Sequence, residues 1–561
     1  MSEMKKIWKR EEIPVEHTWA IEDLYASDAL WEEDLAVMIE EGKHLASFAG
    51  KLNNAEDLYA FLHADEMADL RMGRLAGYCM RKGDEDTRNS TYQAMNGKFR
   101  GVMVKIGSEC SFATPELMAI SDEDLDRFYV EKPELERYRR YLTNMRRLKA
   151  HTLSAAEERI LAAAGEVAGA PSNIYSMFAN ADIKFRDAVD AEGNSHPVRQ
   201  GTFVGLEESP DRTLRQSAYE SLYGSFNDYK NTAAGLLNAQ NKQLKFFAET
   251  KKYATAFEAA LNRTNVPTDV YLNLIEAVHQ NLDKMHRYVR LRKKLLGVDE
   301  LRFYDIYTPL LDGVDKYIPI EEAKQTVYES LAPLGEEYRN VIKHAFENRW
   351  IDVYPNEGKR GGAYSAGADV HPFVLLNYTG TLDNQFTLAH EMGHAMHSYL
   401  SHKHQNPIDA NYVIFVAEVA STFNEALLME YLLGKTTDKK ERAYLINHFL
   451  EQFKGTLYRQ TMFAEFELII GRMIGEGKTL TAEVLCEEYK KLNELYFGPD
   501  MVVDDEIAME WARIPHFYYN YYVFQYATGY SAAIALSRKI LAEGESAVKD
   551  YLGFLSGGCS K

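Results

Sequence analysis

The sequence predicts a mainly α-helical fold, with one small β-sheet directly before a helix that carries three closely spaced histidines. Three observations predict it. Long stretches carry apolar residues at spacings of three and four, which is typical of amphipathic helices. Two segments, 183–199 and 350–380, interrupt this pattern with alternating apolar residues and glycine-containing turns. Of the 561 residues, 46% are hydrophobic and none belong to a fixed-period repeat, so we expect a folded chain with more than one core.

The composition indicates which binding partners and which cellular compartment to expect. The formal net charge of −20 argues against a nucleic-acid partner, because phosphates would be repelled. No run of 18 apolar residues predicts a membrane span, and the first 19 residues lack the apolar core of a signal peptide. The four cysteines are scattered and form no CxxC pair, which is typical of a reducing compartment. We therefore expect a cytoplasmic protein without a nucleic-acid or membrane partner, and the sequence does not set its oligomeric state.

The helical pattern of the first half has recognisable starts and stops. Ser154 and Glu157 have the spacing of a capping box, which predicts a helix beginning there. The turn residues at 192–194 predict a β-hairpin, after which helical spacing resumes from 210 to 348. The other helices predicted in this half cover residues 31–42, 55–73 and 133–150. We divide the chain into an N-terminal helical region (1–110), a helical lid region ending in the hairpin (111–200) and a catalytic domain (201–561).

The second break, at 350–380, is the best candidate for the small sheet. A β-rich run at 372–378 follows a glycine loop at 358–367 that contains KRGGAYS. The loop lacks the GxxxxGK[ST] order of a phosphate-binding loop. It suits an exposed strand edge, to which an extended peptide could add through main-chain hydrogen bonds, and an ordinary turn is the alternative.

A helix over residues 383–400 would carry the stretch LAHEMGHAMHS, with its apolar residues in one buried stripe. His390 and His394 are four residues apart, so their Cβ atoms would lie about 5–6 Å apart on one face. Two imidazoles at that spacing can reach one metal ion. Glu391 would lie about 100° round the helix, where its carboxylate can act as a general base on a water molecule. This is the HExxH pattern of zinc peptidases.

A catalytic zinc needs a third protein ligand and an open position. His397 would lie two turns from His390, about 10 Å along the axis, so it cannot share the ion. A carboxylate from another helix is expected instead. The apolar segment 411–433, which we expect to end at Gly434, is interrupted by Glu418, Glu425 and Glu430. Glu418 and Glu425 share a face, so one could bind the metal while the other holds a ligating histidine, and ordinary buried acids are the alternative.

The run HFYYNYYVFQYATGY, residues 516–530, is dense in aromatic residues. On a helix, His516, Tyr519, either Tyr522 or Val523, and Tyr526 would share a face. Core packing explains most of these rings. A run that prefers Tyr to Phe also offers hydroxyl donors, which could stabilise the negative charge that develops on a peptide carbonyl during hydrolysis.

Together these motifs resemble the thimet oligopeptidase family of zinc peptidases, and most closely its oligopeptidase F branch. The resemblance rests on four motifs, which are GGAYS at 361–365, HEMGHAMH at 390–397, FVAEVAS at 415–421 and IPH at 514–516 with the aromatic run after it. It implies a large helical clamshell with a deep channel for short peptides. It also implies one zinc ion per chain, held by His390, His394 and Glu418, with Glu391 as the catalytic base.

The resemblance further implies that His516 and one or two tyrosines stabilise the oxyanion. Tyr522 is preferred because it precedes the Gln525–Tyr526 pair that the family also shows, and Tyr519 is a further candidate. If the tyrosine that stabilises the oxyanion is chosen by its distance in sequence from His516, Tyr521 is favoured instead. The oligopeptidase F branch usually continues beyond the stretch FLSGGCSK, so a further C-terminal segment is expected there.

The predicted function is a zinc-dependent endopeptidase that hydrolyses short oligopeptides. A zinc carboxypeptidase on a similar helical scaffold is the second hypothesis. A non-catalytic helical protein with a structural zinc is the third, although structural sites are closed by four protein ligands and would leave Glu391 without a role.

Overall fold

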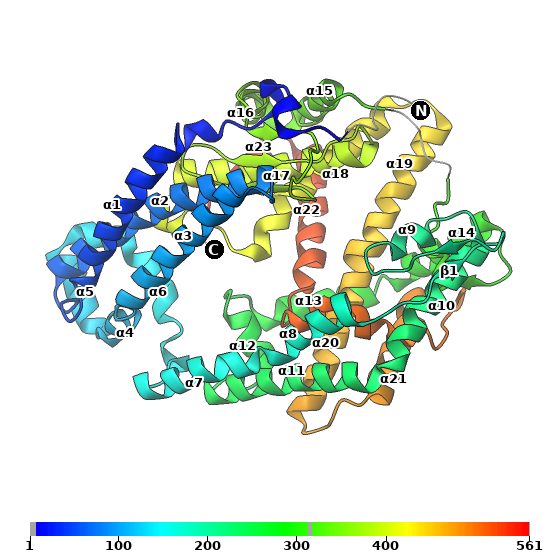
Figure 1. Cartoon of the computed structure of the whole chain (residues 1–561), viewed down its shortest axis with the longest axis horizontal. Coiled ribbons are helices and arrows are strands. Elements are labelled where there is room, and N and C mark those ends of the chain that lie inside the picture. Colours follow the sequence, from blue (N-terminus) through cyan, green and yellow to red (C-terminus); the bar gives the residue numbers. More distant parts are fainter. Residues whose placement is uncertain (1–6, 312–316, 560–561) are drawn as a thin grey trace. The chain divides into compact units, whose positions relative to one another are not determined.

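The computed structural model describes residues 7–311 and 317–559 and consists mainly of α-helices, as predicted (Figure 1). Its contacts divide the chain into two compact units, each built from separate stretches. Unit 1 comprises residues 1–149, 315–435 and 532–561, and unit 2 comprises residues 150–314 and 436–531. The predicted division into 1–110, 111–200 and 201–561 stays a prediction.

Unit 1 begins with long helices whose starts are capped as their sequences suggest. The Ser27 side chain accepts from Leu30 N, and the Asn54 side chain accepts from Asp57 N. Trp31, Leu58 and Leu75 are fully buried in the core that these helices share. The helices within unit 1 are α1 (Asp28–Ala46), α2 (Ala55–Glu85), α3 (Ser90–Glu109), α4 (Ala113–Ala119), α5 (Asp122–Glu131), α6 (Arg139–Arg146), α15 (Ile320–Ser330), α16 (Gly335–Glu347), α17 (Leu382–His404), α18 (Ile414–Lys435) and α23 (Glu545–Leu555).

The small sheet predicted at 350–380 belongs to unit 1. It has three strands in the order β4 (Ile351–Asp352), β6 (Phe373–Leu375) and β5 (Tyr364–Ala366). The central strand β6 is buried along its whole length and pairs in parallel with β4 and antiparallel with β5. Strand β5 is therefore an edge strand, and it packs against α17.

Unit 2 is also helical, and the capping box predicted at Ser154 and Glu157 begins α7. The predicted hairpin is present as β1 (Ala188–Val189) and β2 (Ser195–His196), and β3 (Leu301–Arg302) pairs with β7 (Met501–Val502). Its helices are α7 (Ala155–Ala168), α8 (Ala170–Met177), α9 (Phe203–Glu207), α10 (Arg212–Asp228), α11 (Lys230–Thr250), α12 (Ala256–Asn262), α13 (Thr268–His279), α14 (Leu282–Leu296), α19 (Lys439–Gln452), α20 (Arg459–Gly475) and α21 (Ala482–Phe497). The division between the units falls inside α22 (Phe524–Glu543).

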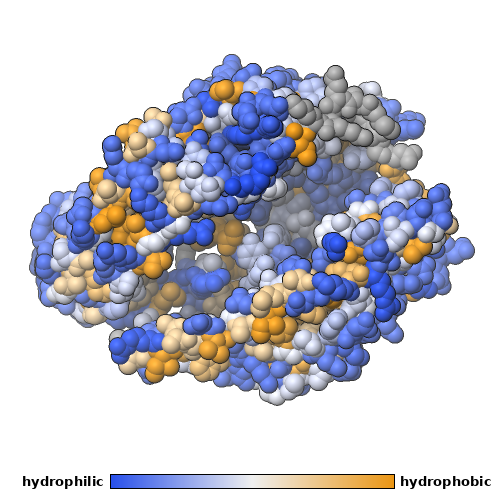
Figure 2. Space-filling model, in the orientation of Figure 1, coloured by the Kyte–Doolittle hydropathy of each residue, from blue (hydrophilic) through white to orange (hydrophobic). Residues whose placement is uncertain are grey.

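Hydrophilic residues cover much of the face shown in Figure 2, with hydrophobic residues scattered between them. Within 7–311 and 317–559, no helix has both the length and the apolar character needed to cross a bilayer.

Candidate metal centre

Helix α17 holds the histidines as predicted. It begins after Thr381, whose side chain accepts from Asn384 N while the Asn384 side chain accepts from Thr381 N. Phe386, Ala389 and Met396 of the predicted apolar stripe are buried. The helix is therefore fixed along one side by the core.

Helix α18 lies directly against α17, and Gly393 is the reason that they approach so closely. A Cβ atom at Gly393 would lie 2.4 Å from the Ala420 carbonyl oxygen and 2.6 Å from Ser421 Cα. No side chain larger than hydrogen fits there without moving the α18 backbone. Helix α18 begins at Ile414, three residues after the predicted start, and ends at Lys435, two residues after the predicted last residue, because Gly434 keeps a helical backbone.

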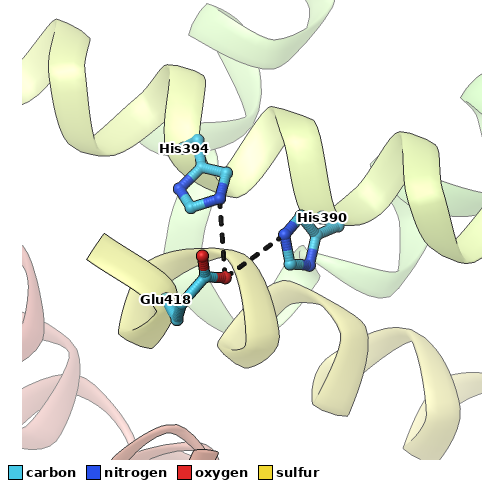
Figure 3. Close-up of side chains that lie close together, drawn as sticks. All are labelled: His390, His394 and Glu418. Atoms are coloured by element: carbon cyan, nitrogen blue, oxygen red, sulfur yellow. Dashed lines mark ion pairs between the residues drawn. The ribbon is translucent and has the colours of Figure 1, made fainter. Parts of the chain in front are cut away.

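His390, His394 and Glu418 converge where the two helices meet (Figure 3). Glu418 Oε2 lies 3.4 Å from His390 Nε2 and 3.7 Å from His394 Nε2. Ligands about 2.0–2.1 Å from one tetrahedral zinc would lie roughly 3.4 Å apart, so this arrangement fits such an ion. Among the residues that the structure describes, this is the one group of three metal-binding side chains that lie close enough to share an ion.

Two further residues of α18 support this group. Glu425 Oε1 lies 2.5 Å from His390 Nδ1, so His390 presents Nε2 toward Glu418. Ser421 Oγ donates to Glu418 Oε2 at 3.1 Å. Glu418 and Glu425 were predicted to share the roles of metal ligand and support for a histidine, whereas nothing in the sequence pointed to Ser421, because a serine in a helix is not distinctive. Glu430, the third acid of the segment, is exposed.

The charges of these groups are strongly coupled. Burial opposes a positive charge on His390, but hydrogen bonds with Glu418 and Glu425 raise its pKa well above the usual value. Burial likewise opposes a negative charge on Glu418, yet its hydrogen bond with His390 lowers its pKa to about 2. Burial lowers the pKa of His394 to about 4. The carboxylates thus favour positive charge at this position, which suits a divalent cation.

Glu391 follows the first ligand-type histidine and is 6% exposed. Its Oε2 atom is buried and has no hydrogen-bond partner among the described residues. Burial raises the pKa of its carboxyl to about 7, although His390 opposes the shift. A buried carboxylate with a free oxygen suits a residue that exchanges a proton with a bound water or substrate.

His397 is not part of the metal group, as its helical position predicts. Its ring stacks on Tyr412 with centroids 3.6 Å apart, and it is 1% exposed. Burial lowers the pKa of His397 to about 3, so it is a neutral packing residue.

The aromatic run is not a single helix, which corrects the assumption made from the sequence. A short 3₁₀-helix, η12 (Pro515–Tyr518), is followed by left-handed backbone at Asn520 and Tyr521, and α22 begins at Phe524. Four rings nevertheless gather as predicted, and we call His516, Tyr519, Tyr522 and Tyr526 the ring cluster. The ring centroids of His516 and Tyr519 are 5.3 Å apart, and those of Tyr522 and Tyr526 are also 5.3 Å apart.

The ring cluster belongs to unit 2, whereas His390, His394, Glu391 and Glu418 belong to unit 1. The roles predicted for His516, Tyr519 and Tyr522 stay predictions. Burial, together with the positive charge of Arg459, lowers the pKa of His516 and so favours its neutral form, which has one N–H group. The ring of Tyr521, the alternative from counting, contacts Phe257 and Tyr271 instead.

Hydrogen bonds connect the edge strand β5 to the C-terminal part of α2. Tyr364 Oη donates to Asp84 Oδ2 at 2.7 Å, and Arg81 Nη2 donates to the Ala366 carbonyl oxygen at 3.2 Å. No described strand pairs with the other edge of β5. This edge lies next to α17, and binding of an extended peptide to it stays a prediction.

The chain is similar to known peptidases over nearly its full length. Two family models match it, Peptidase family M3 over residues 205–561 and Oligopeptidase F over residues 116–185. Oligopeptidase PepF of Bacillus subtilis (strain 168) is 46% identical over 566 residues, which cover 100% of this chain and 84% of that protein.

Two further relatives agree with these matches. The chromosomal oligoendopeptidase F of Lactococcus lactis subsp. cremoris is 40% identical over 98% of this chain and 92% of its own length. The crystal structure of oligoendopeptidase-F from Enterococcus faecium has a TM-score of 0.73 and 36% identity, and the match covers 95% of this chain and 92% of that one. The family indicated by the HEMGHAMH and FVAEVAS motifs is thereby confirmed, and the chain belongs to peptidase family M3.

Proposed function

We propose that this protein is a zinc-dependent endopeptidase that hydrolyses short oligopeptides. Membership of peptidase family M3 and similarity to several oligoendopeptidases support hydrolysis of peptides. The observation that carries the proposal is the convergence of two histidines and a glutamate from neighbouring helices, with a buried glutamate directly after the first histidine.

His390, His394 and Glu418 would hold one zinc ion per chain. Zinc in such a site supplies Lewis-acid activation of the peptide carbonyl and of the attacking water. Glu391 removes the proton from the water and passes it to the leaving amine. Glu425 keeps the His390 ring in the orientation and tautomer that present Nε2 to the ion.

Strand β5 provides a place for the substrate backbone. A peptide added at its free edge would be bound through main-chain groups, which do not depend on the peptide's sequence. His516, Tyr522 and Tyr519 of the ring cluster are assigned as donors to the carbonyl oxygen as charge develops on it.

The four cysteines, Cys79, Cys110, Cys486 and Cys559, are all free thiols. Free thiols suit a reducing compartment, which supports the prediction that the enzyme works in the cytoplasm.

Two substitutions separate chemistry from metal binding. Glu391→Gln should keep zinc but lower kcat/KM by roughly 10²–10⁴-fold, because the general base is lost while the ligands remain. Glu418→Ala should lose both zinc and activity. Elemental analysis of each purified variant, alongside hydrolysis of a fluorogenic peptide, measures both properties. Full activity in Glu391→Gln would remove Glu391 from the mechanism, and full zinc content in Glu418→Ala would remove Glu418 from the ligand set.

A further inference from the structure

Unit 2 contains a cavity of about 840 Å³ that includes none of the residues assigned above to metal binding or catalysis. We call it the Tyr521 cavity. It is lined by the C-terminal part of α11, the helix α12, the start of α13 and the C-terminal part of α20, together with Tyr521. Its volume lies within the range of small-molecule binding sites, roughly 300–1,000 Å³.

Tyr521 reaches this cavity because of an unusual backbone. Asn520 has φ 61° and Tyr521 has φ 59°, a left-handed conformation that asparagine tolerates and tyrosine rarely adopts. The conformation is held by specific hydrogen bonds. Tyr521 N donates to Glu467 Oε1 at 2.9 Å, and Gln240 Nε2 donates to Asn520 Oδ1 at 2.9 Å. Strained backbone that is fixed in this way is often found at functional sites.

The Tyr521 side chain is 5% exposed, yet its hydroxyl has no hydrogen-bond partner among the described residues. Space for the hydroxyl is left by Gly471, where a Cβ atom would lie 2.0 Å from Tyr521 Oη. Gly471 and Tyr521 both line the cavity. No hydrogen bond to a described residue occupies this hydroxyl, so it is available to a molecule in the cavity.

Two of the residues that line the cavity, Lys245 and Arg472, are positively charged. Lys245 Nζ donates to the carbonyl oxygens of Ile474 and Gly475 and lies 3.6 Å from Glu249 Oε1. Arg472 also lines the cavity and forms no ion pair within 4.0 Å with a described residue, although its charge contributes to the lowered pKa of Glu476. Of these two cations, Arg472 is therefore the one with its charge available.

The two other acids of the lining are already engaged. Glu258 Oε2 accepts from Ala254 N at 3.0 Å, and Glu476 Oε2 lies 2.7 Å from Lys478 Nζ. Burial and the negative charge of Glu467 raise the pKa of the Tyr521 hydroxyl, and the positive charge of Arg472 acts in the opposite direction. Apolar side chains supply the rest of the wall, namely Phe257, Val266, Pro267, Leu272, Leu468 and Ile474.

We propose that the Tyr521 cavity binds the carboxylate of a hydrophobic amino acid, either free or at the C-terminus of a short peptide. The Tyr521 hydroxyl donates to one carboxylate oxygen, and the Arg472 guanidinium pairs with the other. The apolar wall covers the side chain. This site is additional to the proposed metal centre and does not depend on it.

Isothermal titration calorimetry tests the proposal on the zinc-loaded full chain carrying Glu391→Gln, which prevents turnover of peptides. N-acetyl-L-phenylalanine should bind saturably, and its uncharged amide should bind at least tenfold more weakly, the scale of a lost charge-assisted pair. Adding Tyr521→Phe, which keeps the ring, or Arg472→Gln should each weaken binding roughly tenfold. Arg287→Gln removes an exposed cation of unit 2 that does not line the cavity and should leave binding unchanged.

Free L-phenylalanine and an N-acetylated tripeptide ending in phenylalanine distinguish the two sources of the carboxylate. Binding of both shows that a free amino acid is accepted, whereas binding of the tripeptide alone assigns the site to peptide C-termini. Absence of saturable binding at millimolar concentrations would overturn the proposal. Binding that Tyr521→Phe and Arg472→Gln leave unchanged would also overturn it, since the ligand would then be bound elsewhere, for example at the metal.

Discussion

Glu467 is a buried acid whose protonation should couple the stability of unit 2 to pH. It is 4% exposed, accepts one hydrogen bond from Tyr521 N, and leaves Oε2 without a partner among the described residues. Burial raises the pKa of its carboxyl to about 8. Between the usual pKa of a glutamate and about 8, the folded chain keeps a proton that the unfolded chain has lost, so stability falls as pH rises through this window.

Glu467→Gln should therefore stabilise the protein at alkaline pH and have little effect at acidic pH. The expected gain is on the order of a few kcal/mol, because each unit of pKa shift corresponds to about 1.4 kcal/mol. Thermal unfolding at roughly pH 5 and pH 9 measures the difference between the variant and the parent chain. Glu220→Gln, at an exposed position of α10, is the matched control. An equal effect of Glu467→Gln at both pH values would contradict the assignment.

Individual residues differ in how far the sequence predicts them. The spacing of His390 and His394 determines their common face, because a helix has a fixed number of residues per turn. Tyr521 shows the opposite case. Its left-handed backbone moves its ring away from the ring cluster. A prediction that assumes a regular helix from His516 onward cannot include this change of backbone conformation.

At the scale of elements, the metal centre depends on how closely α17 and α18 pack. Gly393 allows that approach, since a Cβ atom there would meet backbone atoms of Ala420 and Ser421 at 2.4–2.6 Å. Backbone atoms cannot rotate aside as the end of a side chain can. Any residue larger than glycine must therefore push α18 away and carry Glu418 with it.

Gly393→Ala should consequently lower zinc affinity by at least tenfold, the scale seen when the support of a ligand is lost. Gly434→Ala is the matched control on α18, because nothing lies within 4 Å of a Cβ atom at that position. Competition with a chelator of known affinity measures zinc binding for both variants. If Gly393→Ala bound zinc as tightly as the parent chain, close packing at this glycine would not be what places Glu418.

The sequence predicted the type and position of the elements that form the metal centre, including α17, α18 and the small sheet. Spacing alone left the third ligand open between Glu418 and Glu425, because both lie on one face of α18, whereas the family resemblance implied Glu418. The role of Glu418 stays a prediction, which the distances to the histidines favour. Glu418 Oε2 lies near the Nε2 atoms of both His390 and His394, whereas Glu425 reaches Nδ1 of His390.

At the scale of the whole molecule, each compact unit is assembled from stretches far apart in the chain. Unit 1 combines the N-terminal helices with α15–α18 and the C-terminal residues, and unit 2 combines 150–314 with 436–531. The spacing of apolar residues predicts helices and strands, but it does not predict which distant segments share a hydrophobic core. Sequence reasoning therefore divides a chain into contiguous regions, and the division into 1–110, 111–200 and 201–561 stays a prediction.

Whether the protein is an endopeptidase or a carboxypeptidase is also a property of the whole chain. It depends on whether a peptide substrate can be bound when the peptide has no free terminus. An endopeptidase needs only main-chain contacts on both sides of the cleaved bond, as the free edge of β5 can offer. A carboxypeptidase must instead bind the terminal carboxylate beside the metal. A peptide that is acetylated at one end, amidated at the other and quenched internally should therefore be cleaved by this protein.

Mass spectrometry of the two products locates the cleaved bond, and the expected result is one or more internal cuts with both blocked ends intact. Treatment with a chelator should abolish cleavage and added zinc should restore it, because the histidines and Glu418 remain in place without the ion. The same peptide with a free C-terminus is the matched control. Cleavage of that control alone, by removal of its last residues, would assign the chain to the carboxypeptidase class while leaving the metal centre as described.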